Sequence, residues 1–89
     1  MVIMLPNISP DVTVQHVGDE SLVLDLNSGQ IHQLNTTAAW ILAQCNGENS
    51  IESIVRSFAK QFSLDSETAA SDVAGTIEHL MQVNVIDSE

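Results

Sequence analysis

Hydrophobic and polar residues alternate along three short runs in the first half of the chain. A period of two is typical of β-strands that bury one face. The runs are separated by the turn-forming residues Gly18-Asp19-Glu20 and Asn27-Ser28-Gly29. The pattern therefore predicts a three-stranded antiparallel meander, with strands at residues 12–17, 22–26 and 30–34.

After residue 35 the hydrophobic residues recur with the period of a helix. Side chains suited to cap a helix N-terminus occur at three places: Asn35 with the two following threonines, Asn49 or Ser50, and Asp65. Glu52 follows Asn49 by three residues, as in a capping box. The expected helices cover residues 36–45, 50–62 and 66–83.

Each of the two longer expected helices carries an apolar stripe. The stripe of the second helix consists of Ile51, Ile54, Val55, Phe58 and Phe62. In the third helix Val73, Ile77, Leu80 and Asn84 share one face, and Val85-Ile86 follows as an apolar plug. This face is flanked on one side by Ala69 and Thr76, with Asp72 and His79 further round, and on the other side by Ala70 and Met81.

Three strands followed by three helices with short joints indicate an α+β domain of the winged-helix type. The chain of 89 residues is long enough for one small domain with a thin core. We expect an N-terminal lead-in over residues 1–11 and the folded domain over residues 12–89. Gly47, after the first helix, is suited to a left-handed position.

The charge is strongly acidic, with twelve Asp and Glu against two Lys and Arg and a formal net charge of −10. Such a field repels phosphate backbones and anionic membrane surfaces, so neither nucleic acid nor membrane is expected as a partner. It is compatible with a basic peptide or protein, or with acidic residues that simply keep the domain soluble. The apolar start, residues 1–5, is too short for a signal peptide, which makes the cytoplasm the default location.

The sequence contains no constellation of residues that points to catalysis, a metal or a cofactor. The histidines at positions 16, 32 and 79 and the single Cys45 lack metal-ligand spacing. Cys45 lies in an apolar helical run, so we expect a buried, structural thiol. No glycine-rich phosphate loop occurs. The residues alone favour a binding module rather than an enzyme.

Short motifs along residues 12–86 resemble, in order and spacing, the PqqD-like family of RiPP recognition elements, where RiPP denotes a ribosomally made, post-translationally modified peptide. Each motif is short, and their order carries the resemblance. The matching pieces are Leu34-Asn35 at the end of a strand, Thr37-Ala38 in a helix, the Asn46-Gly47 break, Ser50 with Ile54, and Asp72-Val73. Thr76 departs from the family, which commonly has a bulky apolar residue there, and so does Asn84, which stands near a common glycine.

The resemblance implies a winged-helix domain that binds the leader segment of a precursor peptide and presents it to a maturation enzyme. The leader would add as an antiparallel strand and lie against the third helix. The enzyme would be a radical SAM enzyme, a leader peptidase or a cyclase. The product class stays open between pyrroloquinoline quinone and another RiPP such as a lasso peptide.

Strand addition requires an unpaired edge, and the expected third strand contains no Pro or Lys to protect one. The sequence does not orient the third helix, so its Ala70 and Met81 flank stays an alternative side of the groove. The rival functions are a winged-helix DNA-binding regulator and a structural subunit without a peptide ligand. The expected peptide-binding residues are Gln30, Ile31, His32, Gln33 and Leu34 on the strand, and Ala69, Asp72, Val73, Thr76 and His79 on the helix.

Overall fold

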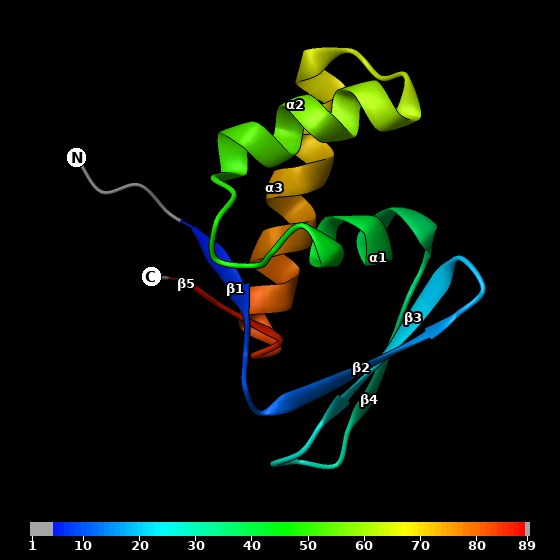
Figure 1. Cartoon of the computed structure of the whole chain (residues 1–89), viewed down its shortest axis with the longest axis vertical. Helices are drawn as coiled ribbons and strands as arrows, with labels where there is room; N and C mark the ends of the chain where they lie inside the picture. The colour runs from blue at the N-terminus through cyan, green and yellow to red at the C-terminus, as the bar shows by residue number, and fades with distance from the viewer. Residues whose placement is uncertain (1–4, 89) are drawn as a thin grey trace.

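The computed structural model describes residues 5–88, and these form two small antiparallel sheets and three helices (Figure 1). The three-stranded sheet has the order β2-β3-β4, and the two-stranded sheet pairs β1 with β5. The predicted α+β fold, a three-stranded meander followed by three helices, is confirmed. The elements are β1 Pro6–Ile8, β2 Val12–Val17, β3 Glu20–Asp25, β4 Ile31–Leu34, α1 Thr36–Ala43, α2 Ile51–Phe62, α3 Ser66–Gln82 and β5 Ile86–Ser88.

Both turns of the meander are built by local polar chemistry. Gly18 has a φ of 64° in the two-residue turn between β2 and β3, a conformation that glycine adopts without strain. In the second turn the Asp25 Oδ1 accepts hydrogen bonds from the backbone N–H groups of Asn27, at 2.9 Å, and Ser28, at 3.3 Å. These bonds lower the pKa of the Asp25 carboxyl, the first of them most. β3 covers residues 20–25 rather than the expected 22–26.

The β1–β5 sheet is not predicted by the sequence pattern. Residues 6–8 lie in the segment expected to be a lead-in, and residues 86–88 follow the expected apolar plug. β1 is also tied to the loop after α1, because the Ile8 N–H donates to the Cys45 carbonyl at 3.0 Å and the Gly47 N–H donates to the Pro6 carbonyl at 2.9 Å. The two ends of the described chain therefore lie side by side (Figure 1).

The short helix α1 begins where the sequence predicts and ends earlier. The Asn35 side chain accepts a hydrogen bond from the Ala38 N–H at 2.9 Å and caps the first turn. The helix ends at Ala43 rather than near Cys45. Gly47 is left-handed, with a φ of 79°, but it lies further along the loop than the position directly after a helix. There it allows the chain to approach β1.

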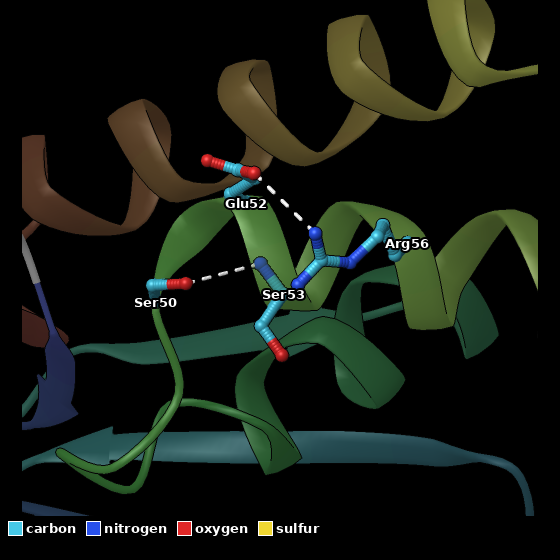
Figure 2. Close-up of polar contacts among 4 residues, drawn as sticks. All are labelled: Ser50, Glu52, Ser53 and Arg56. Carbon is cyan, nitrogen blue, oxygen red and sulfur yellow. Dashed lines mark hydrogen bonds and ion pairs between the residues drawn. The ribbon is translucent and has the colours of Figure 1, made fainter.

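Helix α2 is capped by Ser50, whose hydroxyl accepts a hydrogen bond from the Ser53 N–H at 3.1 Å (Figure 2). The expected capping box between Asn49 and Glu52 is wrong, because the helix begins one residue later than that motif requires. Glu52 instead pairs with Arg56 one turn along, with 3.3 Å between Oε1 and Nη1. Both side chains of this pair are largely exposed, so it contributes little to stability.

The core lies between the helices and one face of the three-stranded sheet. Asp65 caps α3, as predicted, by accepting a hydrogen bond from the Thr68 N–H at 2.9 Å. Asn84 is left-handed, with a φ of 62°, a conformation that Asn adopts more readily than most residues. The largest fully buried side chains of the core are Val23, Ile41, Leu42, Ile54, Phe58, Val73, Leu80 and Val85.

Candidate peptide-binding edge

β4 is an edge strand, because its one hydrogen-bonded neighbour among the described strands is β3. Its four residues, Ile31–Leu34, contain neither Pro nor Lys. Natural sheets commonly use those residues to prevent an edge from pairing with another chain. The edge predicted from the sequence is therefore present and unprotected.

The register shows which backbone groups of β4 face the open side. The Asp25 N–H donates to the Gln30 carbonyl at 2.9 Å, while the next residue of the chain, Leu26, donates to Asp11 beside β2 at 2.8 Å. Hydrogen-bonded pairs alternate along an antiparallel ladder. His32 and Leu34, opposite Val23 and Ser21, therefore direct their backbone groups to β3. Ile31 and Gln33 direct theirs to the open edge.

Side chains of β4 alternate between the two faces of the sheet. Leu34 is 6% exposed and lies on the inner face, the one that packs on the helices, whereas Ile31 is 66% exposed on the outer face. The Gln33 side chain also lies on the outer face, where its Nε2 donates to the Glu20 Oε1 at 3.2 Å. An added strand would thus continue one buried and one exposed face.

His32 is half-buried on the inner face of β4, opposite the fully buried Val23. Its Nε2 is buried and has no hydrogen-bond partner within residues 5–88. The ring lies near enough to Asp25 to lower the pKa of that carboxyl slightly, after the larger effects of the N–H groups of Asn27 and Ser28. Buried polar side-chain atoms nearly always have a hydrogen-bond partner, so this nitrogen is an exception.

The five candidate residues of α3 separate into two groups. Ala69 and Val73 are fully buried at 0% exposure and belong to the core. Asp72 and His79 are exposed, and Thr76 is half-buried. Helix α1 contacts α3, β3 and β4 (Figure 1).

The opposite flank of α3, which the sequence left open as an alternative side of the peptide site, carries an apolar groove of about 470 Å³. Met81, named above as an alternative, lines it, while Ala70 does not. The sequence already indicates this surface, because Ala74, Ile77, Glu78 and Met81 are spaced by three, four and seven residues and therefore lie on one side of the helix. The groove is lined by Ile51, Ala74, Ile77, Glu78, Met81 and Gln82.

The described residues offer little for covalent or metal chemistry. Cys45 is buried, as predicted, and its Sγ donates to the Ile41 carbonyl at 3.3 Å. Burial raises the pKa of this thiol to about 11, so it is protonated at neutral pH. Among residues 5–88, no group of three or more His, Cys, Asp or Glu is placed to hold a metal ion.

No described helix combines the length and the apolar character needed to cross a membrane. The longest of them, α3, contains Glu67, Asp72 and Glu78.

Two solved structures have the same fold. "TbiB1 in Complex with the TbiA(beta) Leader Peptide" matches with a TM-score of 0.84 and 23% identity, over 91% of this chain and 94% of that chain. "Lasso peptide synthetase B1 complexed with the leader peptide" matches with a TM-score of 0.83 and 22% identity, over 93% of this chain and 98% of that chain. No curated protein sequence matches the chain.

A family comparison extends the likeness from fold to sequence. The family model described as "Coenzyme PQQ synthesis protein D (PqqD)" matches residues 20–86. The match begins at β3 and ends at the first residue of β5, so it includes the open edge strand and all three helices. The chain therefore belongs to the PqqD family.

Proposed function

We propose that this protein binds the leader segment of a ribosomally made precursor peptide by strand addition along β4, and presents it to a maturation enzyme. The observation that carries the proposal is the open β4 edge, with the backbone groups of Ile31 and Gln33 directed outward. Main-chain hydrogen bonds supply much of the affinity in this mode of recognition. The two B1 structures of the same fold, each with a bound leader peptide, support this reading.

The protein would act without catalysis of its own, since the thiol of Cys45 is buried and protonated. Chemistry would fall to a radical SAM enzyme, a leader peptidase or a cyclase, and binding would take place in the cytoplasm. The peptide would lie between β4 and α3, where Asp72, Thr76 and His79 are accessible at least in part. Asp72 would pair with a basic leader residue.

The decisive experiment removes one outward N–H group from the edge. Gln33→Pro deletes a donor that β3 does not use, and an edge strand tolerates proline at such a position. We expect leader binding to weaken at least about tenfold, equivalent to about 1.4 kcal/mol. The measurement is fluorescence anisotropy with labelled leader peptides from precursor genes in the same gene cluster.

Two further variants make the experiment specific. His16→Pro is the matched control, since its N–H points outward from the other edge of the sheet, and it should bind the leader as the parent does. His32→Pro removes an N–H that bonds to β3 and should lower stability. Circular dichroism verifies that each variant is folded. A folded Gln33→Pro that binds the leader as tightly as the parent contradicts strand addition.

A further inference from the structure

The unpartnered nitrogen of His32 stands apart from the other polar groups of the sheet. Its Nε2 is the one buried side-chain nitrogen or oxygen within residues 5–88 that lacks a hydrogen-bond partner. His16, on the same face of the sheet but on the other edge strand, has its Nδ1 3.0 Å from the Ser21 Oγ. Buried polar atoms in native proteins are nearly always paired, so the exception on β4 calls for a partner.

The register determines what an added strand would place beside His32. The outward backbone groups belong to Ile31 and Gln33, so these two residues would form the hydrogen-bonded pairs with the new strand. The residue opposite His32 would then belong to a non-hydrogen-bonded pair, in which the two Cα atoms lie only about 4.5 Å apart. Directly opposite side chains lie on the same face, so this one side chain of the peptide would point inward beside the imidazole.

We propose that His32 selects the bound peptide for a neutral hydrogen-bonding side chain, a hydroxyl or a carboxamide, at the position opposite it. This inference rests on the proposed function and adds a residue that determines specificity. A hydroxyl can donate to or accept from Nε2 in either tautomer of the ring. An aliphatic side chain of equal size would keep the nitrogen buried and unpaired.

The surroundings of His32 favour a neutral partner over an acidic one. The Asp25 carboxylate lies on the same face of the sheet, two residues along β3 from Val23, which is opposite His32. It is near enough to interact with the ring. The chain as a whole carries a net charge of −10. A carboxylate in the peptide would be repelled by both, whereas a hydroxyl or carboxamide makes the hydrogen bond without that cost.

The test uses Thr and Val, which have nearly the same shape and differ by a hydroxyl. Each position of the strand-forming part of a labelled leader peptide from the same gene cluster is replaced by Thr and, separately, by Val. At one position the parent protein should bind the Thr peptide roughly three- to tenfold more tightly than the Val peptide. His32→Phe keeps a ring of similar size without the nitrogen, and it should abolish or reverse this ratio at that position alone.

Two more variants complete the design. His32→Gln retains a polar group and should keep the Thr preference. Loss of the preference in a folded His32→Gln would contradict the inference, which also covers the case in which His32→Phe fails to fold. His16→Leu changes the same residue type on the far edge strand and should leave every ratio unchanged. Ratios that are the same in the parent and in a folded His32→Phe overturn the inference while leader binding stands. If no leader binds the parent, the proposed function fails first and this inference fails with it.

Discussion

Cys45 shows how the core determines the chemistry of a single side chain. The residue is 0% exposed, and its Sγ donates to the carbonyl of Ile41, four residues earlier in the chain. Burial in apolar surroundings opposes the thiolate, because the charged form would lose its solvation. The pKa of the thiol is therefore raised from about 9.0 to about 11.

This shift predicts a loss of stability on the alkaline side. Between pH 9 and pH 11 the unfolded thiol releases its proton while the folded thiol keeps it. The unfolded state then binds fewer protons, so the free energy of unfolding falls as the pH rises, by about 2–3 kcal/mol in total. Urea unfolding at several pH values measures the fall, and Cys45→Ala should reduce it. An equal fall in parent and variant would show that other groups cause it.

Individual residues near helix starts were predictable because their signals are local. Asn35, Ser50 and Asp65 all cap helices, and each bonds an N–H three residues away. The capping box failed because Asn49 and Ser50 both qualify as caps, and one residue of shift changes the partner of Glu52. The left-handed Ser63, with a φ of 54° after α2, has no sequence signal of the kind that glycine gives.

At the scale of elements, α1 and α2 are joined by an aromatic cluster. The Phe58 ring lies 5.6 Å from the Trp40 ring and 4.8 Å from the Phe62 ring, measured between centroids. Phe58 is 1% exposed, whereas the other two rings are half-buried. The apolar stripe read from the sequence of α2 is thus a core-facing stripe, as predicted.

Phe58→Ala should remove about 3–5 kcal/mol from the free energy of unfolding, because the cavity is enclosed by both helices. Phe62→Ala serves as the comparison and should cost less, since its ring is partly exposed. Urea unfolding followed by the fluorescence of Trp40, the single tryptophan, measures both. Equal losses in the two variants would mean that burial does not decide the contribution.

The three-residue strands β1 and β5 could not be predicted from the sequence pattern. β1 contains Pro6, and neither β1 nor β5 is long enough to show a period of two. Their pairing joins positions that are about eighty residues apart, so no local pattern announces it. The β4 edge was predictable from composition, but its outward N–H groups were not, because they depend on the pairing register. The choice between the two flanks of α3 likewise depends on how the helices pack.

At the scale of the whole molecule, Gly47 joins the loop after α1 to β1, because its N–H donates to the Pro6 carbonyl at 2.9 Å. A Cβ at this position would lie 3.3 Å from the Asn7 side chain on β1, and the φ of 79° disfavours any side chain. Gly29 has nearly the same φ, 77°, with open space around it. Substitutions at Gly29 and Gly47 therefore separate the destabilisation caused by the backbone conformation from the destabilisation caused by displacing β1.

Gly47→Ala should destabilise the protein by more than about 1 kcal/mol, and by more than Gly29→Ala does. Thermal unfolding of the two variants measures the difference. A larger loss in Gly29→Ala would contradict the role assigned to the contact between β1 and the loop after α1.

The net charge of −10 also acts on the whole molecule, because it attracts cationic partners and repels phosphate backbones. The net charge by itself does not determine where on the surface a partner binds. In the proposed function, the place of binding is set instead by the open edge of β4, which has no neighbouring strand on that side among the described residues.

The antiparallel pairing of β1 with β5 has a consequence for protein engineering. It places Pro6 opposite Ser88, so a short linker between these ends would close the chain into a ring. The ring can then be opened elsewhere, for example in the exposed turn at Gly18-Asp19, which lies outside β4. Such a circular permutant would keep the edge strand and its neighbours in place while carrying a cargo domain on new ends.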